Sequence, residues 1–395
     1  MNHPLPKISI LVPARNEEKN LPVLLRSLAR LAYPKEKTEI LLGNDGSDDR
    51  TGALMEEFCR GRAGVIVVHL REGEDQLLSG NTYVSDGATE PDPGNTVDNG
   101  SPREETSYSL SSEAHTPPGS GRPTASEARI KDEPEKRSVK IHPLTGKTRV
   151  LDELAARATG EYLFFTDADI ELPPDWIPGM LAGFEEDTGV VVGATGFRRS
   201  SLWATLQGME WLMALTLFKI AADRGFPSTG LGNNMAVSRK AYDAVGGYRA
   251  LGFSIVEDYF LYKNIIDAGF GFRHLLCPGV LSFTVPPPRY FEQRRRWIKG
   301  AMENAPAAMA GGILQALCIP LLFLLGWISP VIPAVVTGVL VLIYGTLILY
   351  FQARLRISGY LRYLPLFTVY ISTAWLMQFI YYLLSRETVW KGRKY

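Results

Sequence analysis

Apolar positions along the first 70 residues switch between the spacing of strands and the spacing of helices. A short apolar run at 8–13 is typical of a buried strand. Leucines between 21 and 28 then follow the i, i+3, i+4, i+7 spacing of one helix face. Further strands are predicted at 39–43 and 65–70, with a helix at 51–59 between them. This series predicts an α/β fold, a mainly parallel sheet with helices on both faces.

The ends of the predicted strands carry polar residues that suggest a site. Asp45 follows the second strand, and Asp167 and Asp169 follow another apolar run at 162–165. In open parallel sheets, ligands bind beyond the carboxyl ends of the strands. Carboxylates two residues apart can share a hard divalent cation such as Mg²⁺ or Mn²⁺. The simpler alternative is that these aspartates only form turns and caps.

The alternating pattern is interrupted between residues 71 and 140. This segment is rich in Ser, Gly, Pro, Thr, Glu and Asp, and it has almost no apolar periodicity. Such a composition cannot bury enough surface to offset the entropy of ordering, so we expect a disordered insertion at 71–140. Order is expected to resume near residue 144, in a helix with Val150, Leu151 and Leu154 on one face.

Long uncharged stretches dominate the last quarter of the chain. No charged residue occurs between Glu303 and Arg354, or between Arg362 and Arg386. Since about 20 apolar residues suffice to cross a bilayer, we expect membrane spans here. The predicted boundaries are a soluble domain at 1–300, a membrane domain at 301–395, and spans at about 307–328, 331–351 and 364–384.

Basic clusters predict how these stretches are oriented. The clusters at 294–299 and 354–362 should both lie on the cytoplasmic side, joined by two spans. A third span would carry the basic tail at 391–394 to the other side, so one stretch is expected to be re-entrant or interfacial, and the sequence leaves open which one. The segment 203–222 is predicted to be an interfacial amphipathic helix, with a packed core helix as the alternative.

Composition narrows the class of protein. The 42 basic and 42 acidic residues cancel, so nothing indicates a nucleic-acid partner. The 3 cysteines are far apart and the 5 histidines are scattered, which argues against a disulfide framework or a zinc site. The N-terminus lacks the apolar core of a signal peptide. We therefore expect a multi-pass protein of the inner or plasma membrane with a cytoplasmic soluble domain.

Two further groups of residues could carry chemistry. Glu257 and Asp258 open a predicted helix, where they could stabilise the helix dipole or supply a general base. Gln293, Arg296 and Trp297 lie just before the first uncharged stretch. They could anchor the chain at the membrane surface, or they could hold a pyrophosphate and stack on an acceptor.

Taken in order, these motifs resemble those of the family 2 glycosyltransferases, which have a GT-A fold, a Rossmann-like nucleotide-sugar transferase domain. More narrowly, they are similar to the membrane branch with cellulose, chitin and hyaluronan synthases and ceramide glucosyltransferase. The resemblance covers about 7–300 without the insertion, which is a departure from the family, and it continues into the spans. Asn44 stands where the family commonly has Asp, but the following Asp45 is kept. The matching pieces are 12–17, 44–47, 146–147, 167–169, 232–234, 245–248, 257–258 and Gln293-x-x-Arg296-Trp297.

The resemblance implies a role for each matching residue. Asp258 would be the catalytic base, and Asp169 would bind Mg²⁺ or Mn²⁺. Glu257 and Trp297 would contact the acceptor. The residues implied in binding the nucleotide sugar are Pro13, Arg15, Glu17, Asp45, Lys147, Asp167, Gln293, Arg296 and Trp297.

The expected function is that of an inverting, metal-dependent hexosyltransferase at the cytoplasmic face of the membrane. It would move a sugar from a nucleotide donor, for which UDP is the family's usual nucleotide, to a lipid or lipid-linked acceptor. The alternatives are a processive polysaccharide synthase of the cell envelope and a non-catalytic envelope assembly or binding protein on a transferase fold. The small number of predicted spans favours single transfer. A non-catalytic protein would be expected to lose Asp169 or Asp258, and a transporter would need more spans and intramembrane ionisable residues.

Overall fold

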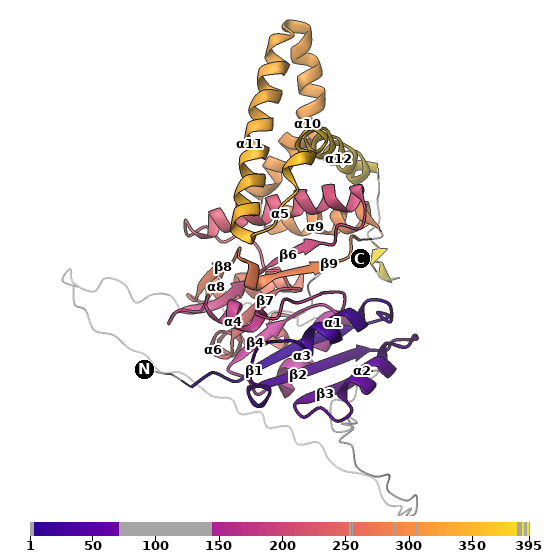
Figure 1. Ribbon diagram of the computed structural model, residues 1–395, viewed down its shortest axis with the longest axis vertical. Helices are drawn as coiled ribbons and strands as arrows, with labels where there is room; N and C mark the ends of the chain where they lie inside the picture. Colours follow the sequence, from indigo (N-terminus) through magenta and orange to yellow (C-terminus); the bar gives the residue numbers. More distant parts are fainter. Residues whose placement is uncertain are drawn as a thin grey trace, which may run out of the picture. The chain divides into compact units, whose positions relative to one another are not determined.

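The computed structural model of the chain describes residues 4–70, 144–252, 254, 256–287, 289–304, 306–384, 389–390 and 393–394. Within these residues, the main sheet consists of β1 (Ile8–Ala14), β2 (Thr38–Asp45), β3 (Val65–Leu70), β4 (Tyr162–Phe165), β5 (Thr188–Val192), β7 (Met235–Ser238) and β8 (Gly271–His274). Their order across the sheet is β3-β2-β1-β4-β7-β5-β8 (Figure 1). The predicted insertion at 71–140 lies outside the described residues.

The sheet is mainly parallel, as the sequence pattern predicted, but it includes an antiparallel strand. β1 pairs in parallel with β2 and β4, β2 with β3, and β5 with β8. β7, however, runs antiparallel between β4 and β5. Between β5 and β7 the chain leaves this sheet for residues 193–234, and it returns in the opposite direction. The parallel half, β1 to β4, is the half whose carboxyl ends carry Asp45 and Asp167.

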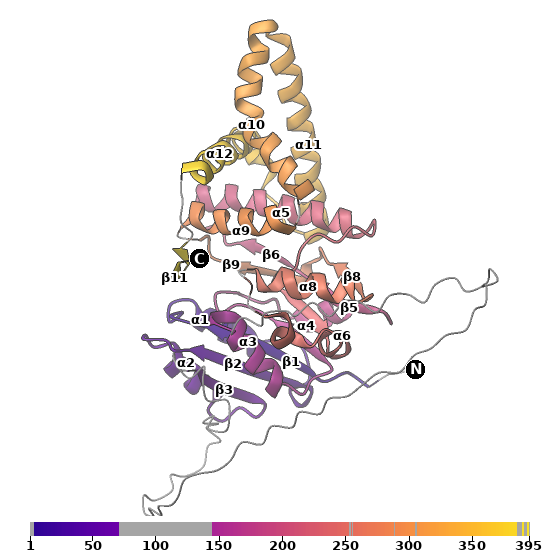
Figure 2. The same cartoon turned by 180° about the vertical axis from the view of Figure 1, so that it is seen from behind.

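Helices cover both faces of this parallel half, as predicted. Leu21 and Leu24 pack in one buried cluster with Ile10 of β1, whereas Leu154 packs in another cluster with Leu11. Neighbouring residues of β1 thus face opposite sides, as the period of a strand requires. Figures 1 and 2 show the sheet from its two sides. The helices around the whole main sheet are α1 (Leu21–Leu28), α2 (Thr51–Cys59), α3 (Gly146–Arg157), α4 (Trp176–Leu181), α6 (Arg239–Ala244), α7 (Gly247–Leu251) and α8 (Glu257–Asp267), with short 3₁₀ turns at Lys35–Lys37 and Pro278–Val280.

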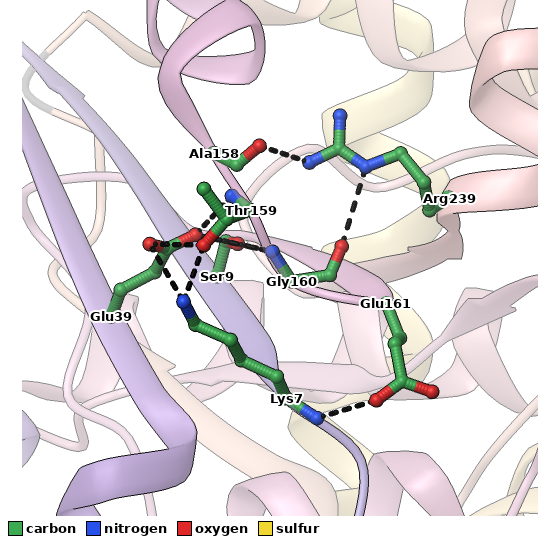
Figure 3. Close-up of polar contacts among 8 residues, drawn as sticks. All are labelled: Lys7, Ser9, Glu39, Ala158, Thr159, Gly160, Glu161 and Arg239. Carbon is green, nitrogen blue, oxygen red and sulfur yellow. Dashed lines mark hydrogen bonds and ion pairs between the residues drawn. The ribbon is translucent and has the colours of Figure 1, made fainter.

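A cluster of hydrogen bonds at the amino-terminal ends of the strands joins β1, β2 and the segment after α3 to one another (Figure 3). The buried Glu39 carboxylate accepts hydrogen bonds from Ser9 Oγ and from the backbone N–H groups of Thr159 and Gly160. Arg239 donates to carbonyl oxygens at the end of α3, at 2.6 Å and 3.3 Å. The Glu39 cluster and Arg239 thus hold the end of α3, the helix whose first turn carries Lys147.

A second, two-stranded sheet is formed by segments that lie between and after the later strands of the main sheet in the sequence. β6 (Ala194–Phe197) pairs in parallel with β9 (Leu281–Thr284), and α5 (Leu202–Ala222) packs on β6. The long helix predicted at 203–222 is therefore present, and its place at a membrane interface stays a prediction. α9 (Tyr290–Asn304) follows β9.

The C-terminal helices are long and apolar enough to cross a membrane, as predicted. They are α10 (Pro306–Ile328), α11 (Val331–Leu355) and α12 (Leu364–Leu384), and a 3₁₀ turn at Leu361–Tyr363 precedes α12. The candidate spans in the described part of the chain are Ala310–Ile328, Val331–Leu355 and Leu361–Leu384. After them, β10 (Val389–Trp390) and β11 (Arg393–Lys394) form an antiparallel pair.

Candidate active site

The parallel strands β1, β2 and β4 bring their carboxyl ends to one edge of the sheet. Asp45 ends β2 and is 5% exposed. Its carboxylate lies 3.1 Å from Arg149 Nη2 and 3.8 Å from Arg15 Nη1. Arg15 comes directly after β1, and Arg149 lies in the first turn of α3. Asp45 and Arg15, which the sequence predicted to belong to one site, thus lie close together. Arg149, which the sequence did not predict, lies next to Asp45 as well.

Lys147 connects two of the predicted carboxylates. Its ammonium lies 2.7 Å from Asp167 Oδ1 and 2.9 Å from Glu257 Oε1. Burial alone would lower the pKa of Lys147, but the carboxylates of Asp167, Glu257 and Asp258 raise it above its ordinary value. Lys147 is therefore a fixed positive charge at the centre of an acidic cluster.

Asp258 lies at the start of α8 with both carboxylate oxygens held by backbone groups. Its Oδ2 accepts a hydrogen bond from Gly232 N, and its Oδ1 accepts one from Tyr259 N, both at 2.8 Å. Burial and the neighbouring Glu257 raise the pKa of Asp258, while Lys147 and the two backbone donors oppose that rise. The carboxylate is thus poorly hydrated and yet rigidly oriented.

Glycines allow the chain to approach Asp258 this closely. A Cβ atom at Gly232 would lie 3.1 Å from Asp258 Cβ and 3.4 Å from Lys147 Nζ. A Cβ atom at Gly230 would lie only 2.4 Å from the carbonyl oxygen of Asp258. Side chains at either position would force the 230–232 segment away from Asp258 and Lys147.

Asp169 lies beyond Asp167 and is joined to a different part of the chain. Thr284 Oγ1, at the end of β9, donates a hydrogen bond to Asp169 Oδ2 at 3.0 Å. Burial and the nearby carboxylates of Asp167 and Glu17 raise the pKa of Asp169 to about 6. Glu17 itself is held through its backbone N–H, which donates to Thr51 Oγ1 at 2.8 Å.

The crowding of negative charge at Asp169 fits a divalent cation. Burial is the largest cause of the raised pKa of Asp169, and the nearby carboxylates of Asp167 and Glu17 add to it. Among the described residues, no group of three or more His, Cys, Asp or Glu side chains could hold a metal ion alone. A cation at Asp169 would therefore complete its shell with water and phosphate oxygens, as Mg²⁺ usually does.

Two residues shape the backbone at the end of β1 and in the loop that follows it. Pro13 lies buried in β1 opposite Gly43. Asn16 has a φ of 55°, and its Oδ1 accepts a hydrogen bond from Asp48 N at 2.9 Å. This hydrogen bond joins the loop after β1 to the loop after β2. Asn16 lies outside α1, which begins at Leu21.

The predicted Gln293, Arg296 and Trp297 lie on α9, which packs against α5. The ring of Trp297 stacks on that of Trp211, with centroids 4.9 Å apart. Arg294 Nη1 lies 2.5 Å from Glu210 Oε1, and both side chains are buried. Gln293 Oε1 is buried without a hydrogen-bond partner. The described contacts of Trp297 thus lead to α5 and not to the Lys147 cluster.

Comparison with known proteins decides the class of the enzyme. The profile of glycosyl transferase family 21 matches residues 141–395, which is more than half of the chain. The chain belongs to glycosyl transferase family 21. The profile of glycosyl transferase family 2 matches residues 9–81. The sequence thus matches profiles of two glycosyltransferase families, and the chain has the predicted α/β, GT-A-type fold class.

Curated relatives of this glycosyltransferase align over parts of their length. It is 48% identical over 54 residues to the probable glycosyltransferase YdaM of Bacillus subtilis, which is 14% of this chain and 13% of the relative. It is 23% identical over 308 residues to the beta-monoglucosyldiacylglycerol synthase of Synechocystis, which is 76% of this chain and 49% of the relative. The chain thus spans no more than about half the length of these two relatives.

Solved glycosyltransferase structures are similar at low sequence identity. The mannosyltransferase PcManGT of Pyrobaculum calidifontis, in complex with GDP-Man and Mn²⁺, is 16% identical, with a TM-score of 0.48 over 96% of this chain and 87% of the other. TarS 1–349 of S. aureus with UDP-GlcNAc is 12% identical, with a TM-score of 0.42 over 98% of this chain and 95% of the other.

Sequence reasoning missed two residues of the glycosyltransferase site. Arg149 lies two positions after Lys147, so the turn of α3 that carries Lys147 was the signal that could have found it. Thr284 reaches Asp169 from a strand 115 positions away, and no local pattern indicates that pairing.

Proposed function

We propose that this glycosyltransferase inverts the configuration of the sugar that it moves from a nucleotide donor to a lipid acceptor. The observation that carries the proposal is the geometry of Asp258, a half-buried carboxylate held by two backbone donors next to a cluster of Lys147, Asp167 and Glu257. An ionised carboxylate with little hydration is a suitable general base for a hydroxyl group. The same cluster lies beyond the carboxyl end of β4, where α/β folds bind ligands.

In the proposed reaction, Asp258 takes the proton of an acceptor hydroxyl. The hydroxyl oxygen attacks C1 of the sugar, while the bond from C1 to the diphosphate oxygen breaks on the opposite face. The electron pair of that bond leaves with the nucleoside diphosphate, and the configuration at C1 inverts. Glu257 contacts the acceptor, and its ion pair with Lys147 keeps it oriented next to Asp258.

The donor is proposed to lie along the edge formed by β1, β2 and β4. Asp45 contacts the base and ribose, and its position between Arg15 and Arg149 supports a fixed orientation. Lys147 and Asp167 contact the sugar nucleotide, for which we propose UDP. Pro13 and Glu17 shape the loop after β1.

Asp169 is the proposed ligand of a Mg²⁺ or Mn²⁺ ion. When bound, such an ion neutralises the charge that develops on the departing diphosphate. Gln293, Arg296 and Trp297 on α9 are proposed to hold the pyrophosphate and the acceptor. The unpartnered Oε1 of Gln293 supports a polar ligand at this helix.

A lipid acceptor is supported by the names of relatives and by the apolar helices. Relatives include beta-monoglucosyldiacylglycerol synthases and the 4,4'-diaponeurosporenoate glycosyltransferase of Staphylococcus haemolyticus, which is 44% identical over 51 residues. α10 and α11 are long and apolar enough to keep the enzyme at the membrane where such acceptors reside. We place the catalytic domain on the cytoplasmic side, where nucleotide sugars are made available and where basic clusters such as 294–299 are favoured.

Product analysis tests the proposal. Membranes with the enzyme are incubated with a panel of radiolabelled nucleotide sugars, and lipid-soluble products are separated from polymers. We expect label in the lipid fraction, which disappears with EDTA and returns with Mn²⁺. Polymeric label would instead mean a polysaccharide synthase, and no label with any donor would favour a non-catalytic binding protein. Nuclear magnetic resonance of the product then compares the anomeric configuration with that of the donor, and retention would contradict the mechanism.

A further inference from the structure

The third apolar helix, α12, differs from α10 and α11 in what it contacts. All three are long and apolar enough to cross a membrane. If all three crossed, the chain beyond residue 384 would lie opposite the catalytic domain, together with the basic tail at 391–394. Basic segments near apolar helices favour the cytoplasmic side, so this arrangement is unfavourable.

One part of α12 is tied to a buried ion pair of the two preceding helices. Tyr370 OH donates a hydrogen bond to Glu210 Oε2 at 3.0 Å. The other oxygen of Glu210, on α5, pairs with Arg294 of α9 at 2.5 Å. The hydroxyl of Tyr290, also on α9, lies 3.3 Å from that of Tyr370.

The far end of α12 also contacts α9. Gln378 Nε2 donates to the carbonyl oxygen of Phe291 at 3.4 Å. The ring centroids of Phe291 and Tyr381 are 5.4 Å apart. The guanidinium carbon of Arg295 lies 5.4 Å from the centre of the Tyr382 ring. Charged groups thus lie against α12 at two places, Glu210 and Arg294 near Tyr370 and Arg295 near Tyr382. Figures 1 and 2 show α12 next to α5 and α9 from both sides.

The separation of these two places decides between crossing and lying flat. Tyr370 and Tyr382 are about 18 Å apart along the helix axis, at 1.5 Å per residue. The hydrocarbon core is about 30 Å thick, so in a crossing α12 both contacts would fall within the core or at its edge, and Tyr370, with the Arg294–Glu210 pair beside it, would lie about 9 Å along the helix from its start. Arginine at such depth is costly. In a helix that lies in the membrane plane, both arginines stay at the level of the lipid headgroups.

A stripe of apolar side chains on α12 is exposed beside the face that contacts α5 and α9. Leu366, Val369, Met377, Ile380, Leu383 and Leu384 are between 45% and 78% exposed. At 100° per residue, they all fall on one face of the helix. The other face is buried against the rest of the protein, and α12 packs closely with α10.

We propose that, of the described apolar helices, α10 and α11 form the hairpin that crosses the bilayer, and that α12 lies in the membrane interface on the catalytic side. Its stripe from Leu366 to Leu384 faces the acyl chains, and its Tyr370 face holds α5 and α9 at the membrane surface. The basic tail at 391–394 then lies on the same side as the catalytic domain. This proposal concerns the fold and holds whether or not the proposed reaction is correct.

Cysteine labelling tests which side each loop occupies. In a variant whose native cysteines are replaced by alanine, single cysteines are introduced at Ser329, Ser358 and Ser385. We expect an impermeant maleimide to label 358 and 385 from the same side of the membrane, and 329 from the opposite side. Labelling of 385 together with 329 would show that α12 crosses and would overturn the proposal. If the catalytic domain lies on the unexpected side of the membrane, each cysteine will be labelled from the opposite side to the one expected. Residues 358 and 385 will still be labelled from the same side as each other.

Depth measurement separates an interfacial helix from a re-entrant one. Spin labels at Val369→Cys, Ile380→Cys and, as a deep reference on α11, Leu342→Cys are compared in phospholipid vesicles by their accessibility to oxygen and to a polar nickel complex. We expect equal, shallow depths at 369 and 380 and a greater depth at 342. A depth at either 369 or 380 that equals the depth at 342 would contradict the proposal.

Discussion

At the scale of the residue, the Lys147 ammonium allows several carboxylates to lie close together. It lies 2.7 Å from Asp167 and 2.9 Å from Glu257. It also opposes the rise in the pKa of Asp258 that burial and Glu257 cause. A carboxylate that is kept ionised in a poorly hydrated place is a stronger base than one in water. The charges around Asp258, together with its orientation, suit it to deprotonate a hydroxyl group.

Asp258→Asn should reduce transfer about 10²–10⁴-fold, because the amide keeps the shape of the side chain but cannot accept the proton. Donor binding should change little. Initial rates of label transfer and calorimetric titration with the donor measure the two effects. Asp187→Asn, which changes an exposed aspartate in the same way, is the matched control and should remain as active as wild type. More than about a tenth of wild-type turnover in Asp258→Asn would mean that another group is the base.

Asp169→Ala should weaken Mn²⁺ binding in the presence of UDP, because it removes a hard oxygen ligand. In the wild type, a proton competes with the metal below the pKa of about 6, so the affinity for Mn²⁺ should rise with pH through that value and then level off. Electron paramagnetic resonance of free Mn²⁺ measures both. If Asp169→Ala keeps the wild-type affinity and the same pH dependence, Asp169 is not the ligand.

At the scale of the element, α3 connects the site with the opposite edge of the sheet. Its first turn carries Lys147 and Arg149, and its last turn is held by Arg239 and by the cluster around Glu39 (Figure 3). Burial alone would raise the pKa of Glu39, but hydrogen bonds from Ser9 and Thr159 outweigh burial and lower the pKa below its ordinary value. The Glu39 cluster therefore stabilises the helix that positions the catalytic charges.

Glu39→Gln should lower the free energy of unfolding by about 1–3 kcal/mol, because buried donors lose their charged acceptor. Since the pKa of Glu39 is lowered in the folded state, its contribution is present above the ordinary pKa of a glutamate, about 4.3, and is lost as pH falls. The difference between wild type and variant should thus shrink on acidification. Chemical denaturation in detergent at several pH values measures it, with the exposed Glu36→Gln as control. Equal stability of Glu39→Gln and Glu36→Gln at neutral pH would refute the role.

At the scale of the whole molecule, the described sheet and helices form one core without the predicted insertion. β3 ends at Leu70 and α3 begins at Gly146, and both elements pack against β2. The strands and helices that carry Asp45, Lys147 and Asp258 all belong to this core.

Deletion of residues 75–138 should leave the melting temperature and the transfer activity unchanged, because a segment without apolar periodicity adds nothing to a core. Differential scanning fluorimetry and the labelling assay check this, with a variant in which a Gly-Ser linker replaces the segment as control. A melting temperature several degrees lower in both variants would show that the insertion docks on the catalytic domain.

Local pattern in the sequence was sufficient for the elements and for much of the site. The strands β1 and β3 and the helix α2 lie where apolar spacing predicted them, because a residue's burial repeats with the period of its own element. Asp45 and Asp167 could be found because parallel strands bring their carboxyl ends to one edge of the sheet, whereas Lys147 was found only through the resemblance to family 2.

Only the tertiary structure decided how distant segments meet. The antiparallel direction of β7, the Thr284–Asp169 hydrogen bond and the contacts of α12 with α9 all join parts of the chain that are far apart in sequence. Apolar periodicity reports that a face is buried, but it does not report which surface covers it. For that reason the sequence was sufficient to predict that α12 is an apolar helix. Its contacts with the charged residues Glu210 and Arg295 could be found only in the tertiary structure.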